Sequence, residues 1–188
     1  MNTTKAIFLD RDGTINVEKD YLFRISDFGF LPGVIPALRM LQEAGYLLII
    51  ITNQSGIARG YYTEDDYQKL NNWMVETLSS QGVKISGAYY CPHHPTATVE
   101  KYRVDCDCRK PKLGMYEKAI ADFNIDLCLS YAIGDKIRDC AICNFTDCHG
   151  FLISHNEKSE VIEAVKNGEY ERVEYADGLL AAAQKILS

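Results

Sequence analysis

Short apolar runs alternate with amphipathic stretches along most of the chain. A continuous apolar run predicts a buried strand, and apolar residues that recur every three or four positions predict a helix. Strands that alternate with helices predict an α/β fold with a mostly parallel sheet. The predicted strands are 5–9, 47–51, 85–90, 130–134 and 151–154, and the predicted helices are 34–44, 63–80, 115–123, a segment after Asp135, and 178–187.

Two of the predicted helices have ends with recognisable chemistry. Thr63 precedes three acidic residues, the arrangement expected of an N-cap and a first helical turn. Gly45 stands where a helix C-cap belongs. Segment 91–111 instead mixes Cys, His and Pro without a core-forming pattern, so we expect an irregular loop there.

Three predicted strands are followed directly by polar residues, namely Asp10, Thr52 and Asp135. Ligands of open α/β sheets bind beyond the carboxyl ends of the strands. If these strands are neighbours, the three side chains converge on one rim of the sheet. The pattern therefore predicts a polar site at that rim.

Composition narrows the class of protein. The 188 residues are 47% hydrophobic and 24% charged, so we expect one globular domain over residues 1–188. No apolar run approaches the roughly 20 residues that span a bilayer, so no membrane partner is expected. The start of the chain, 1–5, lacks a signal-peptide layout, which predicts a cytoplasmic location.

The net charge of −6 disfavours nucleic acid as a partner, because an acidic surface repels polyanions. A phosphorylated small molecule stays possible, because a local cationic pocket can outweigh the mean charge. The seven cysteines are more plausible as metal ligands, nucleophiles or core residues than as disulfides in such a compartment.

The segment FLDRDGT (8–14) places two carboxylates, Asp10 and Asp12, just beyond a strand, with Gly13 permitting a sharp turn. One carboxylate can attack phosphorus to form an acyl phosphate. A second can protonate the leaving oxygen and later deprotonate water. Taken alone, the segment would also fit a turn with solvent-exposed acidic residues.

Three further segments suit phosphate chemistry. ITNQSG (51–56) offers neutral hydroxyl and amide donors, and RKPK (109–112) offers cations that bind phosphate oxygens. In IGDKIRD (133–139), Asp135 and Asp139 offer hard oxygen ligands that could complete a Mg²⁺ site with Asp10. Each segment alone also fits a helix cap or a solvated turn.

The order of these segments resembles the haloacid dehalogenase superfamily of phosphatases over nearly the whole chain. The second Asp of LDRDGT is typical of its phosphotransferase branch. The resemblance implies a three-layer Rossmann-like fold without a large cap and a phosphoric monoester hydrolase activity. It implies these roles: Asp10 as nucleophile and Mg²⁺ ligand, Asp12 as general acid/base and Mg²⁺ ligand through its carbonyl, Thr52 and Lys110 as groups that hold the phosphoryl group, and Asp135 as a Mg²⁺ ligand.

A second cluster predicts zinc. CPHHP (91–95) and CDC (106–108) supply three thiols and two imidazoles, and a Cys₃His set makes a closed structural zinc site. The family resemblance selects His93 over His94. The predicted zinc ligands are Cys91, His93, Cys106 and Cys108. The remaining thiols, Cys140 and Cys143 included, are interpreted as ordinary small residues, mostly in the core.

Together, LDRDGT, TNQSGIARG, CPHH…CDCRKPK and IGDK resemble a narrower group, the D-glycero-D-manno-heptose 1,7-bisphosphate 7-phosphatases and the related histidinol-phosphate phosphatases. The resemblance implies removal of the C7 phosphate in bacterial ADP- or GDP-heptose biosynthesis. It implies that the zinc loop walls the active site and that Arg109 suits the second phosphate. The implied sugar and phosphate contacts are Glu18, Lys19, Asp20, Tyr21, Thr52, Asn53, Gln54, Ser55, Arg109 and Lys110.

The chain departs from the narrower group at two points. Leu113 stands where the group often has a proline, and EKDY (18–21) matches only loosely, so the sugar contacts are the weakest part of the match. Histidinol phosphate is the alternative substrate, although its single phosphate would leave Arg109 poorly used. A zinc-stabilised interaction module is the non-catalytic alternative. A polynucleotide 3′-phosphatase shares the motifs but conflicts with the acidic charge and the lack of a basic stripe.

The expected partner is thus a small phosphorylated sugar, with Mg²⁺ and Zn²⁺ as cofactors, and the chain is expected to act as a monomer. Anomer preference and the glycan that uses the heptose are not encoded in any recognisable motif.

Overall fold

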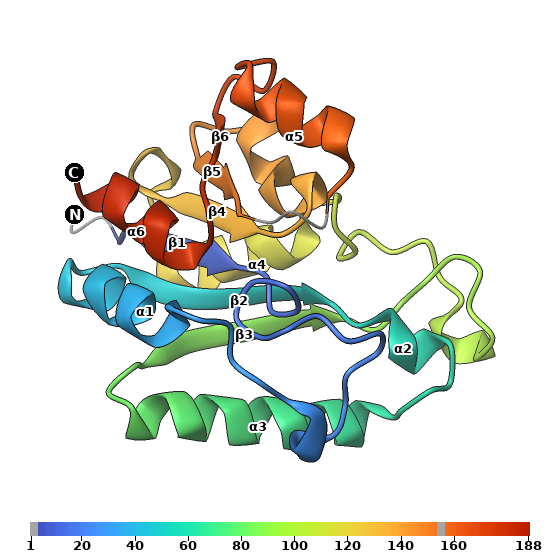
Figure 1. Cartoon of the computed structure of the whole chain (residues 1–188). Helices are drawn as coiled ribbons and strands as arrows, with labels where there is room; N and C mark the ends of the chain where they lie inside the picture. The colour runs from blue at the N-terminus through green and yellow to red at the C-terminus, as the bar shows by residue number, and fades with distance from the viewer. Residues whose placement is uncertain (1–3, 154–156) are drawn as a thin grey trace.

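Six parallel strands form the sheet at the centre of the protein (Figure 1). The structure, a computed structural model, describes residues 4–153 and 157–188. The strands run in the order β3-β2-β1-β4-β5-β6 across the sheet. Their bounds are β1 Ala6–Leu9, β2 Leu47–Asn53, β3 Ile85–Cys91, β4 Tyr131–Gly134, β5 His149–Leu152 and β6 Val173–Tyr175.

Helices connect the strands and cover both faces of the sheet (Figure 1). The α-helices are α1 Val34–Glu43, α2 Ser55–Ala58, α3 Glu64–Ser80, α4 Gly114–Phe123, α5 Ser159–Lys166 and α6 Leu179–Leu187. The 3₁₀ helices are η1 Ile25–Asp27, η2 Glu100–Tyr102, η3 Leu127–Leu129 and η4 Ile137–Asn144.

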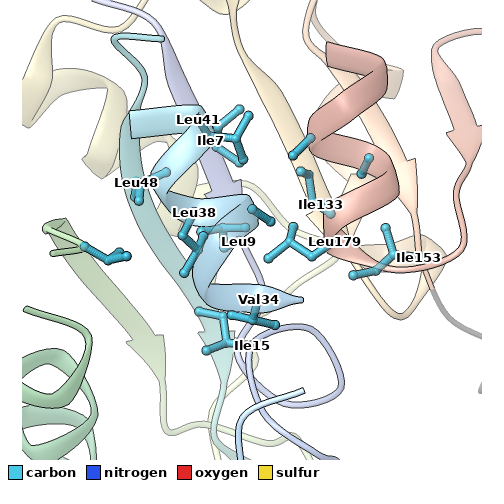
Figure 2. Close-up of a cluster of buried hydrophobic side chains, with 14 of the residues drawn as sticks. Ile7, Leu9, Ile15, Val34, Leu38, Leu41, Leu48, Ile133, Ile153 and Leu179 are labelled. Atoms are coloured by element: carbon cyan, nitrogen blue, oxygen red, sulfur yellow. The ribbon is translucent and has the colours of Figure 1, made fainter. Parts of the chain in front are cut away.

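Alternation along β1 explains the two cores. Side chains of a strand point to opposite faces in turn, so Ile7 and Leu9 join a cluster with α1, α3 and α6. Figure 2 shows this cluster, in which Ile7 lies beside Leu41 of α1, and Leu9 lies between Leu38 of α1 and Leu179 of α6. Ala6 and Phe8 join the opposite cluster, which α4, η4 and α5 cover. Burial on both faces accounts for the continuous apolar run at 5–9, and the three layers confirm the predicted fold class.

The strand order fixes where a ligand can bind. From β1, the following strands β2 and β3 are added on one side of the sheet, whereas β4, β5 and β6 are added on the other. The strands β1 and β4 are therefore neighbours, although more than a hundred residues separate them in the chain. A crevice opens at such a switch point, beyond the carboxyl ends of the two strands. Asp10 follows β1 and Asp135 follows β4, so the fold brings these two carboxylates to the crevice.

The predicted helix ends are confirmed. Thr63 caps α3: its Oγ1 accepts from the backbone N–H of Asp66 at 3.1 Å, while the Asp66 carboxylate accepts from the Thr63 N–H at 2.9 Å. Gly45 adopts a φ of 88° just beyond α1, a conformation that glycine reaches without steric cost.

Several boundaries differ from the predictions. Strand β2 continues through Thr52 and Asn53, and β5 begins at His149, two residues earlier than predicted. Ser154, the last residue of the predicted strand 151–154, lies outside the described residues. Helix α5 and strand β6 are not predicted from the sequence, and the helix expected after Asp135 is the 3₁₀ helix η4.

The segment between β3 and α4, called the zinc loop below (residues 92–113), is a long connection whose only regular element in the described chain is the short 3₁₀ helix η2. On the right of Figure 1 it extends beside α2. The backbone N–H of Val99 donates to the carbonyl of Ala58 at 2.9 Å, and Ala97 and Tyr102 pack into a small apolar cluster with Ile57. In residues 4–153 and 157–188 no separate cap domain is inserted.

Candidate active site

A cavity of about 360 Å³ opens at the switch point of the sheet. It collects nearly all the residues predicted to bind substrate or catalyse, the exception being Arg109. The lining residues are Asp10, Asp12, Glu18, Lys19, Asp20, Tyr21, Leu22, Thr52, Asn53, Gln54, Ser55, Gly56, Tyr62, Lys110, Asp135, Lys136 and Arg138.

Asp10 is held rigidly at the floor of this cavity. Its backbone N–H donates to the carbonyl of Ile133 at 3.0 Å, which ties the end of β1 to β4. Burial raises the pKa of Asp10 to about 6; Lys110 opposes this rise, while Asp139 and Asp12 add to it. A carboxylate that is buried and fixed in place suits a nucleophile, because little reorganisation is needed before attack.

Lys110 is the central cation of the site. Its Nζ donates to Asp10 Oδ1 at 2.8 Å and to the carbonyl of Ile51 at 2.6 Å, and it lies 2.8 Å from Asp139 Oδ1. Burial alone would lower the pKa of Lys110, but the two carboxylates raise it above its ordinary value. Lys110 therefore stays charged, as a group that neutralises phosphoryl oxygens must.

The backbone around Lys110 is clamped to β2. Asn53 Oδ1 accepts from the Lys110 N–H at 3.0 Å, and Asn53 Nδ2 donates to the Lys110 carbonyl at 3.1 Å. The sequence analysis assigned Asn53 to the substrate; in the structure its amide positions the residue that carries the cation.

Asp12 has a dense set of partners. The guanidinium of Arg11 forms a forked contact with both carboxylate oxygens, the shortest N–O distance being 2.8 Å. Asn16 Nδ2 donates to Asp12 Oδ1 at 3.0 Å, and Gln54 Nε2 donates to Oδ2 at 3.0 Å. Arg11 is 1% exposed. These contacts hold the predicted acid/base in one orientation at the pocket wall.

Gln54 links Asp12 to Thr52. Its amide also donates to Thr52 Oγ1 at 2.9 Å, and its carbonyl oxygen accepts from the hydroxyl of Tyr62 at 2.6 Å. With its oxygen accepting from Gln54, the Thr52 hydroxyl can direct its own proton into the cavity. That is the donor expected of a group that binds a phosphoryl oxygen.

Asp135 completes a group of carboxylates suited to a divalent cation. Single oxygens of Asp10, Asp135 and Asp139 lie within 4.8 Å of one another. Burial, and next the charges of Asp10 and Asp139, raise the pKa of Asp135 to about 8. A cation at this point would relieve that repulsion, and carboxylate oxygens are the ligands that Mg²⁺ prefers. Among the predicted Mg²⁺ ligands, Asp12 lies outside this carboxylate group, since its side chain is bound to Arg11.

Gly13 makes room for this group. It has a φ of 77°, and a Cβ at this position would lie 2.5 Å from Asp135 Oδ2. Only glycine therefore allows the turn after β1 to approach β4 so closely.

The structure brings the four predicted zinc ligands together at the base of the zinc loop. The sulfur atom of Cys106 lies 3.5 Å from that of Cys91 and 3.2 Å from that of Cys108. His93 Nδ1 lies 3.4 Å from the sulfur of Cys108 and 3.9 Å from that of Cys91. A tetrahedral zinc with bonds of about 2.3 Å separates sulfur ligands by roughly 3.7 Å, so the donor set fits this metal.

His94 turns away from these thiols. Its Nδ1 accepts from the Thr96 N–H at 3.2 Å, and its Nε2 lies 3.5 Å from Arg59 Nη2. All seven cysteines are free thiols. Cys140, Cys143 and Cys148 are buried in the second core cluster, as expected of small core residues, while Cys128 is exposed.

Three contacts in the site are not predicted from the sequence. Asp139 is predicted only as a possible metal ligand, whereas in the structure it also pairs with Lys110. The sequence motifs assign no role to Arg11 or Tyr62. The contact between Arg11 and Asp12 could be expected because the two residues are adjacent in the chain. The hydrogen bond from Tyr62 to Gln54 depends on how the chain folds after α2, so no sequence pattern predicts it.

Comparison with known proteins agrees with this geometry. The chain matches the family described as polynucleotide kinase 3 phosphatase over residues 5–140. A D-glycero-β-D-manno-heptose-1,7-bisphosphate 7-phosphatase of Haemophilus ducreyi is 54% identical over 136 residues, covering 72% of this chain and 74% of that protein. The protein of the same name from Escherichia coli K12 is 51% identical over 134 residues, 71% and 70% of the two chains.

Solved structures show the same likeness. A D,D-heptose 1,7-bisphosphate phosphatase from B. bronchiseptica, solved with magnesium and phosphate, superposes with a TM-score of 0.81 at 29% identity, over 98% of each chain. The fold and the site thus define a phosphoric monoester hydrolase. The chain belongs to the haloacid dehalogenase superfamily of phosphatases, in the group of the heptose bisphosphate phosphatases.

Proposed function

We propose that this enzyme removes the C7 phosphate of D-glycero-D-manno-heptose 1,7-bisphosphate through an aspartyl-phosphate on Asp10. The observation that carries the proposal is the buried Asp10 carboxylate, 2.8 Å from Lys110 Nζ, in a polar cavity at the switch point of the sheet. The substrate comes from the named relatives, which are 51–54% identical to this chain over the matched 134–136 residues.

In the first half of the reaction, an oxygen of Asp10 attacks the phosphorus of the C7 phosphate. The bond from phosphorus to the C7 oxygen breaks, and Asp12 donates a proton to that oxygen, which leaves as the sugar hydroxyl. Lys110 and the hydroxyl of Thr52 hold the phosphoryl oxygens during the transfer, because this chemistry depends mainly on positioning and charge neutralisation.

In the second half, Asp12, now deprotonated, takes a proton from water, and the water oxygen attacks the phosphorus of the aspartyl-phosphate. Inorganic phosphate leaves and the Asp10 carboxylate is restored. The contacts from Arg11, Asn16 and Gln54 keep Asp12 aimed at one place for both proton transfers.

Mg²⁺ held by Asp10 and Asp135, with the Asp12 carbonyl as the family resemblance implies, would supply positive charge against the phosphate dianion. The solved relative with magnesium and phosphate supports this assignment. Asp139 is within reach of the same position. Zinc held by Cys91, His93, Cys106 and Cys108 would fix the loop that carries Lys110.

The second phosphate of the sugar requires its own cation. Arg109 precedes Lys110 on the clamped turn, and its Nη1 donates to the carbonyl of His93 at 3.2 Å, which ties it to the zinc loop. We propose that Arg109 binds the C1 phosphate while Lys110 serves the reacting one. Glu18 to Tyr21 and Ser55, which line the cavity, are proposed to contact the sugar.

The family described as polynucleotide kinase 3 phosphatase shares the catalytic core, but the net charge of −6 disfavours a polynucleotide substrate. Histidinol phosphate carries a single phosphate, so it would leave the proposed contact with Arg109 unused. The heptose product would be activated as an ADP- or GDP-sugar in a bacterium.

We propose that the enzyme works as a cytoplasmic monomer. No helix in the described part of the chain has the length and apolar character to cross a membrane.

The proposal is tested by phosphate release from heptose 1,7-bisphosphate, fructose 1,6-bisphosphate and histidinol phosphate, with Mg²⁺ present. The heptose should give the highest kcat/KM by at least on the order of 10-fold, since it alone fits both phosphate positions and the sugar contacts. A higher kcat/KM on histidinol phosphate would reject the heptose assignment while leaving the phosphatase mechanism standing.

A further inference from the structure

Tyr62 lies in the wall of the active-site cavity, a few residues beyond α2, and is only 7% exposed. Its hydroxyl donates to Gln54 Oε1 at 2.6 Å. The ring is held by packing: it stacks on Phe23 with 5.3 Å between the ring centroids and an angle of 17° between the planes. It also covers Gly56 so closely that a Cβ there would lie 2.2 Å from Tyr62 Cε1. The position of the hydroxyl is therefore set by the packing of the ring.

Gln54 carries this contact to the acid/base. A primary amide has a donor end and an acceptor end of nearly equal shape, so its hydrogen bonds decide which end faces which partner. Gln54 Nε2 donates to Asp12 Oδ2 at 3.0 Å, while Oε1 accepts from Tyr62 and lies 3.4 Å from Arg11 Nη2. Burial raises the pKa of Tyr62, so its hydroxyl keeps the proton that it donates. The donor end of Gln54 is thereby held on Asp12.

The orientation of this amide matters because Asp12 must give a proton away. In residues 4–153 and 157–188, every hydrogen-bond partner of the Asp12 carboxylate is a donor: the guanidinium of Arg11, Asn16 Nδ2 and Gln54 Nε2. A protonated carboxyl among donors finds no acceptor in the wall, so its proton can turn toward a leaving oxygen in the cavity. If the Gln54 amide were reversed, its oxygen would accept that proton instead, and the acid would point at the wall.

The reversed amide becomes accessible in the state that begins the reaction. While Asp12 is ionised, repulsion between its oxygens and the amide oxygen opposes the reversal. Once Asp12 is protonated, the reversed amide would gain a hydrogen bond from it. The Tyr62 hydroxyl opposes the reversal in that state, because the reversed amide would lose its 2.6 Å contact with Tyr62 and turn its NH₂ group toward Arg11.

We propose that Tyr62 is a positioning residue for the acid/base. Its hydroxyl holds the acceptor end of Gln54 away from Asp12, and this keeps the Asp12 proton directed at the leaving group. The role depends on Asp12 acting as the general acid of the proposed phosphatase, and it does not depend on which sugar is the substrate.

The test uses two aryl phosphates of similar shape whose leaving groups differ in their need for a proton. Phenolate is the poorer leaving group and benefits from protonation by Asp12, whereas 4-nitrophenolate leaves readily without it. Tyr62→Phe keeps the packed ring and removes the hydroxyl. We expect kcat/KM on phenyl phosphate to fall by roughly 3- to 10-fold, the effect of one neutral hydrogen bond, and kcat/KM on 4-nitrophenyl phosphate to change by less than about 2-fold.

Tyr67→Phe is the matched control. The Tyr67 hydroxyl is buried in the same apolar cluster and has no hydrogen-bond partner among the described residues, so its loss should leave both values unchanged. Equal losses on the two substrates in Tyr62→Phe would overturn the proposal, since they would assign the hydroxyl to the fold or to phosphoryl binding through Thr52. An unchanged kcat/KM on phenyl phosphate would overturn it as well.

A double variant tests the route through Gln54. Gln54→Met keeps the length of the side chain and removes both ends of the amide. In this background Tyr62→Phe should cause no further loss on phenyl phosphate, because the partner through which it acts is gone. A further loss as large as that of the single variant would contradict the route. If the enzyme hydrolyses the aryl phosphates but not heptose 1,7-bisphosphate, the substrate assignment fails, while the aryl pair still decides the role of Tyr62.

Discussion

Lys110 Nζ donates to Asp10 Oδ1 at 2.8 Å, joining residues that lie a hundred positions apart in the chain. The contact places a permanent cation beside the carboxylate proposed to attack phosphorus. Lys110 stands near the end of the zinc loop, so the proposed zinc site would also help to position this cation.

Replacement of the nucleophile should abolish turnover without unfolding the protein. Asp10→Asn keeps the shape of the side chain and its contact with Lys110, but it removes the attacking charge. We expect kcat to fall by at least about 10³-fold, because no covalent intermediate can form. A phosphate-release assay measures the loss of turnover, and circular dichroism checks that the variant is folded. Substantial Mg²⁺-dependent turnover by a folded Asp10→Asn protein would argue against the covalent route.

Asp139 should act through Lys110. Asp139→Asn removes one of the two carboxylates that hold the ammonium group, so Lys110 Nζ keeps only Asp10 and the Ile51 carbonyl as partners and is held less firmly. We expect kcat/KM to fall by about 10- to 100-fold, as for other misplaced catalytic groups. Glu163→Gln, which removes an exposed carboxylate near Lys166, is the control and should be neutral. Wild-type kinetics in Asp139→Asn would show that Lys110 needs no second partner.

Asp135 should make the metal-free protein less stable as the pH rises. The folded state binds its proton more tightly than the unfolded chain does, since its pKa is about 8 in the fold against 3.8 ordinarily. Stability therefore decreases as the pH rises from about 4 to about 8. In Mg²⁺-free buffer at pH 8, Asp135→Asn should melt at a higher temperature than wild type, and the addition of Mg²⁺ should stabilise only wild type. A lower melting temperature for the variant at pH 8 would contradict the assigned repulsion.

The zinc site should hold one ion per chain. Cys106→Ser should lose zinc, loosen residues 92–113 and weaken substrate use. The central sheet should remain folded, because Cys106 and Cys108 are only partly buried against the second core and, of the four ligands, Cys91 alone is a buried member of it. Elemental analysis and limited proteolysis measure these effects. Cys128→Ser changes an exposed thiol elsewhere and should retain the metal. Zinc bound in full by Cys106→Ser would contradict the ligand set.

Local sequence patterns accounted for most of the fold. The strand ends at Asp10 and Asp135 were recognisable because apolar runs stop at them, and their meeting followed from the behaviour of parallel sheets. Helix α5 could also have been found, since Ile162 and Val165 recur at helical spacing. The edge strand β6, with only three residues, is too short for its period to be visible.

The site was harder to predict where side chains bond to each other across the fold. The motifs predict Lys110 and Asn53 as phosphate binders, but only the fold shows that the Asn53 side chain bonds to the Lys110 backbone. The Arg11 fork and the Tyr62–Gln54–Asp12 chain likewise depend on tertiary packing. Residue types and their spacing thus predict which side chains lie together in the site. Which of them bond to each other is visible only in the structure.

The identity of the released phosphate tests the central claim most directly. Heptose 1,7-bisphosphate is incubated with the enzyme and Mg²⁺, and the remaining sugar phosphate is assigned by ³¹P nuclear magnetic resonance. Our account places the C7 phosphate at Asp10 and the C1 phosphate at Arg109, so heptose 1-phosphate should accumulate with one equivalent of inorganic phosphate. Accumulation of heptose 7-phosphate, or release of both phosphates at similar rates, would contradict it.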